Sequence, residues 1–398
     1  MSAATARAAT SVADTATSRA RGRGRTFASV ELSEDLDAAR EAWAEIEAAS
    51  LSSPYQSHAF AREWSQTLGA SQGVTPMIVI AHDEAGVVVA LLPLGRFRRG
   101  PLRLAAFLGD RWANFHMGLF RAGQEWTRGD IEALLDEAAR KATPRIDAFV
   151  FISQPSEWRG AANPLAWLDR QPSPSFAFLS RLPESYTLWL DSHFSKASQK
   201  KLRKKAKKLE AFGPVTHARA SGPAEARMLL DTLLAQKRER MRALGLDNAF
   251  EEPATIDFLS RISVSGTPAL ELHALLAGEK IVAVFGGFAD RHRLYGLILS
   301  FDPDPAVAVC SPGELLVMDV VRHAINRGLS VFDLGVGEAR YKSECCETTE
   351  ALFDSAYAAT FAGRIGAAAF LLSRRLKHRV KRSPRLRELA RRLKRRFP

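Results

Sequence analysis

The chain has 398 residues, 46% of them hydrophobic, which is enough for one large core or for two lobes. The formal net charge is +12, but residues 374–396 hold 13 of the 56 basic residues and one of the 44 acidic ones, so the rest carries 43 of each. Three cysteines, two of them adjacent, exclude a disulfide framework, and no apolar run reaches the roughly 18–20 residues that span a bilayer. We therefore expect a neutral, soluble or peripheral body in the cytoplasm, with a separate basic tail.

Residues 1–29 are predicted to be a disordered N-terminal tail. They are rich in Ala, Ser, Thr and Arg, and Asp14 is their only acidic residue. A targeting segment of similar composition is the alternative.

The first folded part is expected over residues 30–190. Apolar spacing predicts helices over 36–48, 58–68 and 130–142, a hairpin over 77–97 that turns at 84–86, and a strand over 147–152. The stretch that follows, up to Pro183, contains prolines and is predicted to be loops. Between hairpin and helix lies a polar loop with Asp110, Arg111, Asn114 and His116.

The second folded part is expected over residues 191–363 and opens with a basic helix. This helix, predicted over 196–210, places eight Lys or Arg in thirteen positions around an apolar stripe of Leu202, Ala206 and Leu209. A solvated face is the default interpretation. Contact with a phosphate-bearing or other anionic small molecule, or with RNA, is the alternative.

Three strands over 270–277, 280–290 and 293–301 are predicted to form an antiparallel meander. Pro312 then suits a first helical turn, and apolar residues repeat with helical spacing as far as Gly328. A short buried strand over 329–337 runs into a polar loop over 338–342. The order of strand, helix start and strand is typical of a site that holds a phosphate at unpaired helical N–H groups.

The C-terminal segment 364–398 reads as a basic amphipathic tail that Pro384 divides into two helical pieces. Leu386, Leu389, Leu393 and Phe397 lie on one helical face with arginines around them. This pattern predicts adsorption to an anionic membrane surface, with nucleic-acid attraction and a plain disordered tail as alternatives.

The segment 270–342 resembles the core of the GNAT acyltransferases, although the usual Arg/Gln-x-x-Gly-x-Gly/Ala signature is replaced by Ser311-Pro312-Gly313. That replacement, with Phe332-Asp333-Leu334-Gly335, Gly337-Glu338 and Tyr341-Lys342 after it, is similar to the CelD-like (BioF2-like) acetyltransferase domain. The likeness spans about residues 60–361 and extends to the Fem peptidyltransferases. It implies an α/β (α+β) fold of two GNAT-like halves, of which the first is degenerate.

The resemblance also implies roles for individual residues. The loop and helix start would bind the pyrophosphate of acetyl-CoA through Cys310, Ser311, Gly313, Glu314 and Leu315. The strand end and the loop after it would supply the catalytic groups, which are Asp333, Glu338, Tyr341 and Lys342. The loop of the first half would bind the acceptor through Asp110, Asn114 and His116. Each of these residues also has a structural interpretation as a paired, packed or solvated side chain.

The nine histidines show no HExxH or other helix-spaced ligand pair, so no metal site is predicted, and His273 and His323 are expected to be ordinary half-buried residues.

The sequence therefore predicts an acyltransferase that moves an acetyl group from acetyl-CoA to an amine or hydroxyl of a small-molecule, sugar or cell-envelope acceptor, linked to cellulose or exopolysaccharide synthesis. A Fem-like transferase that uses aminoacyl-tRNA and a non-catalytic scaffold of polysaccharide synthesis are the alternatives. The acceptor, the acyl length, N- against O-acylation and the oligomeric state are not determined by the sequence.

Overall fold

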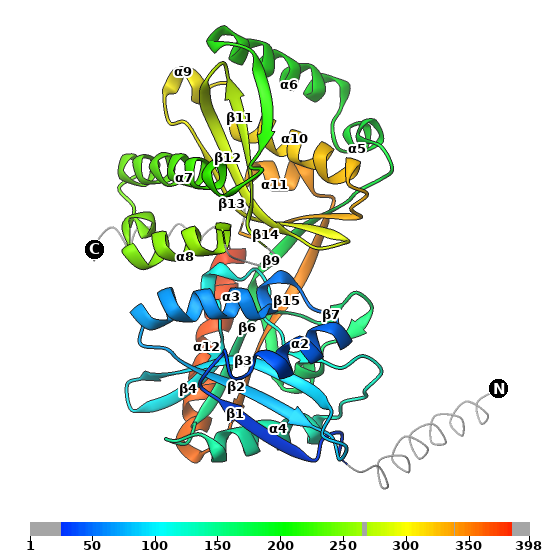
Figure 1. Cartoon of the computed structure of the whole chain (residues 1–398), viewed down its shortest axis with the longest axis vertical. Helices are drawn as coiled ribbons and strands as arrows, with labels where there is room; N and C mark the ends of the chain where they lie inside the picture. The colour runs from blue at the N-terminus through cyan, green and yellow to red at the C-terminus, as the bar shows by residue number, and fades with distance from the viewer. Residues whose placement is uncertain (1–24, 265–268, 338, 384–398) are drawn as a thin grey trace, which may run out of the picture.

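A computed structural model describes residues 25–264, 269–337 and 339–383. Most of its strands join one long mixed sheet with helices on its faces (Figure 1). The strands are β1 (Ser29–Ser33), β2 (Thr75–His82), β3 (Val88–Arg99), β4 (Leu102–Phe107), β5 (Leu119–Phe120), β6 (Ala148–Pro155), β7 (Glu157–Trp158), β8 (Ala161–Ala162), β9 (Asp169–Arg181), β10 (Val215–Arg219), β11 (Glu271–Ala277), β12 (Lys280–Ala289), β13 (Arg293–Phe301), β14 (Val331–Val336) and β15 (Thr348–Ala358). The helices are α2 (Arg40–Ala49), α3 (His58–Trp64), α4 (Arg128–Lys141), α5 (Tyr186–His193), α6 (Lys196–Leu209), α7 (Pro223–Ala243), α8 (Pro253–Val264), α9 (Pro305–Ala308), α10 (Pro312–Asn326), α11 (Arg340–Cys345) and α12 (Phe361–Arg382).

The long sheet repeats one pattern of strand pairing when it is followed inward from either end. The order is β1-β2-β3-β4-β6-β15-β9-β14-β13-β12-β11-β10, with β5 paired to β3. In each half an antiparallel set ends in a parallel pair, β4 with β6 and β13 with β14. The halves then exchange strands, because β9 of the first half pairs with β14 and β15 of the second half pairs with β6. The chain is thus an internal repeat of topology, although no repeat is visible in its residues.

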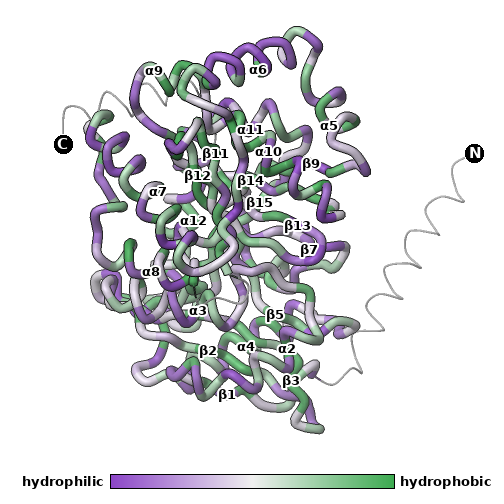
Figure 2. Tube along the Cα trace, turned by 45° about the horizontal axis from the view of Figure 1, so that its top comes forward, coloured by the Kyte–Doolittle hydropathy of each residue, from purple (hydrophilic) through white to green (hydrophobic). Residues whose placement is uncertain are grey.

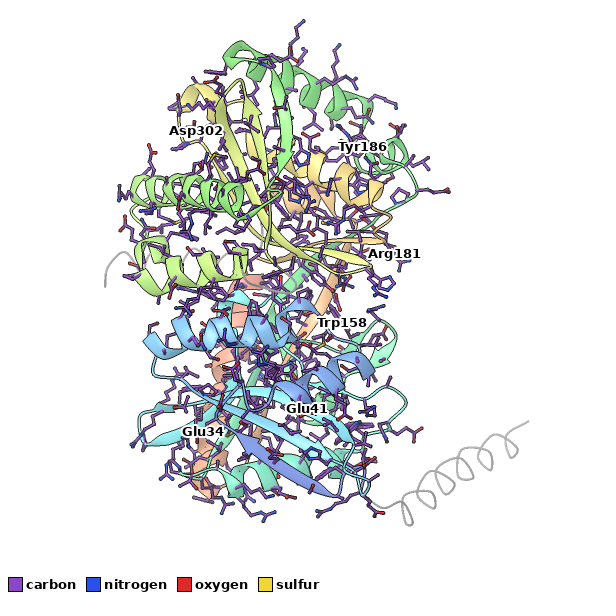
Figure 3. All side chains as sticks on the ribbon, viewed as in Figure 1. Glu34, Glu41, Trp158, Arg181, Tyr186 and Asp302 are labelled. Carbon is purple, nitrogen blue, oxygen red and sulfur yellow. The ribbon has the colours of Figure 1, made fainter. Side chains whose placement is uncertain are left out.

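The exchange makes one molecule of the two halves. In Figure 1 the first half lies below, the second above, and β9 and β15 run through the middle. One hydrophobic core crosses this junction, where the ring of Tyr55 packs edge-on against those of Phe60, Phe288 and Tyr295. Trp158 lies at the same level (Figure 3) and stacks with Tyr295. A shared core of large rings fixes the first half against the cleft of the second.

Helices α7 and α10 cover opposite faces of the second half's sheet. Successive residues of a strand point to opposite faces, and in β11 Leu272 packs in the core under α7 while Leu275 packs under α10. Pro312 stands in the first turn of α10, and Gly328, with φ of +74°, lies just beyond its end. The predicted meander, helix and strand of this half are therefore all present.

Two of the predicted loops are wrong. The proline-containing stretch before residue 183 holds the 13-residue strand β9 rather than loops, since β9 gains partners on both sides from the other half. The polar loop after β14 turns into α11 from Arg340 onward.

The basic tail is not separate from the body as far as residue 383. Residues 361–382 form the continuous helix α12, which packs on β9, β15 and β6, and Arg374 Nε donates to the buried Asp354 at 2.6 Å. The predicted face of Leu386, Leu389, Leu393 and Phe397 lies outside the described residues. Within the described residues, no helix is long and apolar enough to cross a membrane.

Candidate functional site

The site forms where β13 and β14 separate. The two strands pair in parallel over three residues only, from Arg293 opposite Val331 to Tyr295 opposite Asp333. Beyond this point β13 continues along β12 to Phe301, while β14 follows β9 and has a bulge between Asp333 and Gly335. The carbonyl and N–H groups that face each other across the gap need other partners.

Asn114, from the loop of the first half, fills the point of separation. Its Nδ2 donates to the Gly296 carbonyl of β13 at 2.9 Å and to the Tyr55 hydroxyl at 2.7 Å. Its Oδ1 accepts from the Val336 N–H of β14 at 3.5 Å. Gly335 has φ of +66°, and a Cβ on it would lie 2.2 Å from Asn114 Nδ2, so a glycine is needed there. Asn114 is therefore a wedge that holds the two strands apart.

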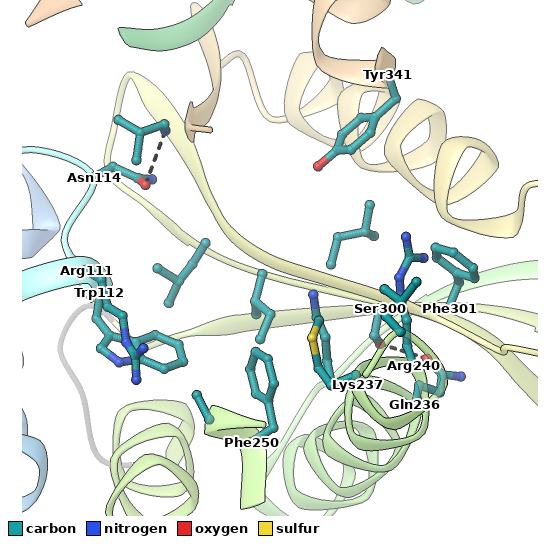
Figure 4. Close-up of a pocket in the computed structure, with 17 residues that line it drawn as sticks. Arg111, Trp112, Asn114, Gln236, Lys237, Arg240, Phe250, Ser300, Phe301 and Tyr341 are labelled. Atoms are coloured by element: carbon teal, nitrogen blue, oxygen red, sulfur yellow. Dashed lines mark hydrogen bonds between the residues drawn. The ribbon is translucent and has the colours of Figure 1, made fainter. Parts of the chain in front are cut away.

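A cavity of about 580 Å³ opens beside this wedge, between β13, α7 and the loop of the first half. Figure 4 shows Tyr341 with its hydroxyl directed inward from one side, and Lys237 and Phe250 on the opposite side. Burial, aided by nearby Arg240 and Lys342, lowers the pKa of Lys237 to about 8. Arg111 and Arg240 also line the cavity, and no Asp or Glu does among the described residues.

A second cavity, of about 780 Å³, lies at the start of α10 and adjoins the first, with which it shares Arg240, Leu299, Phe301 and Tyr341. Ser311, Gly313 and Glu314 line it from the helix start. Lys201 and Lys205 line it from the basic helix α6, which is confirmed over Lys196–Leu209 and is strongly hydrophilic (Figure 2).

The start of α10 lacks the usual side-chain cap. Ser311 adopts the left-handed conformation, with φ of +51°, and its hydroxyl caps no N–H. A non-glycine residue in this region is strained, which is common at sites that present backbone to a ligand. The N–H groups of Glu314 and Leu315 donate to the Ser311 carbonyl at 3.0 and 3.2 Å. The Gly313 N–H, the positive end of the helix dipole and two lysines are thus the groups that converge on the cavity.

The equivalent helix of the first half, α4, is closed to such a ligand. Thr127 accepts from Asp130 N–H and Asp130 accepts from Thr127 N–H, so a capping box occupies the helix start. Both helix starts carry a first-turn carboxylate, Asp130 in α4 and Glu314 in α10, but the one in α10 is paired with Lys205. Of these two described helices, α10 is the one whose start has no side-chain cap.

The predicted cofactor residues divide into two groups. Ser311, Gly313 and Glu314 line the cavity, and Glu314 forms an ion pair with Lys205. Cys310 is buried under the helix start, and its thiol donates to the Ala306 carbonyl at 3.8 Å. Leu315 packs in the core.

The predicted catalytic residues are also separated by the structure. Tyr341 lines both cavities, whereas Asp333 and Lys342 line neither. Asp333 is fully buried, where it accepts from Gly335 N–H at 2.7 Å and pairs with Arg293 at 3.2 Å, and burial raises its pKa to about 6. Lys342 Nζ donates to the carbonyls of Leu334 and Val336 at 2.6 and 2.9 Å, and burial lowers its pKa to about 8. Glu338 lies outside the described residues.

The three predicted acceptor residues do not share one cavity. Asn114 lines the cavity of the second half, but Asp110 and His116 line a different one, of about 860 Å³, between β4, β6 and α12. Burial lowers the pKa of His116 to about 4. The sequence also missed Lys237, Arg240 and Phe250, because a helical pattern does not distinguish a cavity-facing Lys or Arg from a solvated one.

Three histidines meet on the α10 side of the sheet. His217 Nε2 lies 3.0 Å from His273 Nδ1, and one ligand atom each from Glu271, His273 and His323 lie within 4.8 Å of one another. His273 is fully buried, so its prediction as half-buried is wrong. Arg327 donates to both oxygens of Glu271, at 3.0 and 2.7 Å, so this carboxylate is already neutralised. Nε2 of His273 and Nε2 of His323 are buried and have no hydrogen-bond partner among the described residues.

Comparisons with known proteins agree with this geometry. Residues 196–343 match the family model described as the acetyltransferase (GNAT) domain. The separated strands β13 and β14 and the open start of α10 all lie within the matched residues. No curated protein matches the chain.

Solved structures share the fold over most of the chain. FemX is 11% identical with a TM-score of 0.53, and the match covers 79% of this chain and 95% of FemX. A conserved protein of unknown function from Bacteroides thetaiotaomicron is 11% identical with a TM-score of 0.53, over 82% of this chain and 99% of that one. The predicted α/β fold of two GNAT-like halves is confirmed. A match to the GNAT domain implies a transferase and suggests an acyl-CoA as the co-substrate.

Proposed function

We propose that the protein transfers an acetyl group from acetyl-CoA to an amine or hydroxyl of an anionic small-molecule, sugar or cell-envelope acceptor. The observation that carries this proposal is the uncapped start of α10, which opens beside Lys201 and Lys205 into a cavity that adjoins the gap between β13 and β14. Backbone N–H groups and lysines at this place suit the pyrophosphate of CoA. A role in cellulose or exopolysaccharide synthesis stays part of the proposal.

The acceptor is proposed to be anionic because of the charges around the first cavity. Arg111, Lys237 and Arg240 line it without a carboxylate among the described lining residues. A cationic acceptor would meet like charges in a partly desolvated space, whereas a carboxylate or phosphate would meet guanidinium groups. Trp112 and Phe250 offer flat apolar surfaces for a sugar or alkyl group.

Direct transfer needs the acceptor held near the thioester, a base for its proton, and a donor for the leaving thiolate. Lys237, with a pKa near 8, is the proposed base, since a sizeable fraction is neutral at slightly alkaline pH. Burial raises the pKa of Tyr341, so its hydroxyl stays protonated and can donate to the thiolate. Asp333 and Lys342 are proposed to act behind these groups by fixing the exit of β14.

A release assay for free CoA tests the proposal with a matched pair of acceptors, glucosamine and glucosamine 6-phosphate. We expect kcat/KM to be at least tenfold higher for the phosphorylated sugar and Arg240→Gln to remove most of that difference. Equal rates for the two sugars would contradict the anionic acceptor. Binding of aminoacyl-tRNA in place of acetyl-CoA would favour a Fem-like transferase, to which the shared fold with FemX and the basic α6 give some support. No affinity for either would indicate a scaffold.

A further inference from the structure

The helix α12 carries its large apolar side chains on the outside. Phe361, Ile365, Leu372 and Leu376 are 78%, 66%, 65% and 60% exposed. At about 100° per residue these four positions fall within roughly 60° of one another around the helix axis. They form one stripe along a helix of 22 residues. We call these four residues the outer stripe.

The opposite face of α12 is built for close contact with the sheet. Gly363 and Ala367 are buried there, and a Cβ on Gly363 would lie 1.8 Å from the Asp147 carbonyl oxygen. Polar residues of this face are tied to the body, with His378 Nδ1 at 2.9 Å from the Ser173 carbonyl and Lys381 Nζ at 2.9 Å from Ser175 Oγ. These contacts fix the rotation of α12 about its axis, so the outer stripe stays exposed to solvent.

Basic residues follow one edge of the outer stripe. Arg364, Arg375, Arg379 and Arg382 are exposed, project from the same half of the helix, and form no ion pair with a described residue. The helix contains no Asp or Glu. Large apolar side chains beside a row of unpaired arginines are complementary to a surface with anionic groups above a hydrocarbon layer.

We infer that the outer face of α12 docks the protein on an anionic lipid bilayer, with the outer stripe in the hydrocarbon boundary and the four arginines at the headgroups. A helix that lies in the interface needs an apolar face and a basic rim, and it need not be long enough to span the bilayer. The docking face is the solvent-facing side of α12, which packs on β9, β15 and β6 with its other side. Docking does not depend on the proposed acyl transfer. It differs from the sequence prediction, which placed the membrane contact on residues after Pro384.

Sedimentation with vesicles tests the inference on the full chain. Vesicles of phosphatidylglycerol and phosphatidylcholine should bind the protein, vesicles of phosphatidylcholine alone should bind it at least tenfold more weakly, and salt should weaken binding. The variant with Ile365→Gln, Leu372→Gln and Leu376→Gln should lose binding at least tenfold. Because these side chains are exposed, the variant should keep its melting temperature.

A matched control changes three exposed apolar residues elsewhere, as Leu188→Gln, Met228→Gln and Leu246→Gln, which are 56%, 52% and 56% exposed. The control should bind vesicles as the wild type does. Equal binding by both triple variants would refute the inference. A chain that ends at Ser383 should keep binding that depends on the outer stripe, and complete loss of binding in that chain would assign the contact to the later residues instead.

A fluorophore supplies a local readout. Leu372→Cys, labelled with an environment-sensitive dye, should shift to shorter wavelength when anionic vesicles are added, while the same label at Leu188→Cys should not. The dye could instead shift with protein concentration in the absence of lipid, and the wild type could form a dimer that the outer-stripe variant does not form. Together these results would show that a second copy of the chain covers this face, and they would overturn the inference.

Discussion

The wedge formed by Asn114 and Gly335 gives a prediction whose size can be worked from the structure. Asn114→Ala removes the donor to the Gly296 carbonyl and to the Tyr55 hydroxyl, both of which lie in the interior. A buried polar group left without its partner costs about 1–3 kcal/mol. With two such groups, we expect the free energy of unfolding to fall by about 2–6 kcal/mol.

Gly335→Ala should break the same contacts from the other side. Its Cβ would lie 2.2 Å from Asn114 Nδ2, so the Asn114 side chain must move away. The left-handed backbone costs a residue with a Cβ about 1–2 kcal/mol more. The sum is about 3–8 kcal/mol. The double variant should cost no more than Gly335→Ala alone, because the contacts of Asn114 can be lost only once.

Urea unfolding followed by tryptophan fluorescence measures this cycle. Gly86→Ala is the matched control, since Gly86 has φ of +80° and open space around its Cβ position, and it should cost only about 1–2 kcal/mol. If the costs of Asn114→Ala and Gly335→Ala simply add in the double variant, the two residues do not act together and the wedge is wrongly assigned.

Further predictions concern the helix start, the cavity and the buried acid. Gly313→Asp should weaken acetyl-CoA binding more than tenfold, whereas Gly313→Ala should bind normally because its Cβ would make ordinary contacts of 3.4 Å or more; equal affinities in a titration would remove the phosphate assignment. Tyr341→Phe should lower kcat about 10²-fold with unchanged acetyl-CoA affinity, and Lys237→Met should abolish the rise of rate as pH increases through 8; a retained rise would exclude Lys237 as the base. Asp333 has a folded pKa of about 6 against 3.8 unfolded, so its contribution to stability is present below pH 4 and is lost as pH rises through 6. Relative to Asp333→Asn, the wild type should therefore lose about 2–3 kcal/mol of unfolding free energy between pH 4 and pH 7, and a difference that stays constant would show that burial does not perturb this acid.

The sequence was informative where structure is local. Pro312 and Gly328 mark the ends of α10, and alternation of side chains predicted the meander, because these signals depend only on neighbouring residues. Strand β9 was missed because its residues lack a strand pattern of their own and gain their order from β14 and β15, which follow much later in the chain. Exchange between halves is a non-local event that single-sequence patterns do not encode.

The site was predictable only in part for the same reason. The helix start at Ser311 and Gly313 could be named from its place after the meander. Asn114 was predicted to bind the acceptor substrate, yet its main hydrogen bonds hold β13 and β14 apart. The sequence could not show this, because only the docked halves bring Asn114 next to Gly296. Lys237 faces the cavity because of how α7 packs, which its helical pattern does not reveal.

Calorimetric titration with acetyl-CoA tests whether the start of α10 binds the cofactor. Two halves share a topology, but only α10 has an open helix start, while the start of α4 is closed by Thr127 and Asp130. We predict one acetyl-CoA bound per chain, and an affinity more than tenfold lower in Gly313→Asp. Two sites per chain, or unchanged binding by a folded Gly313→Asp variant, would contradict it.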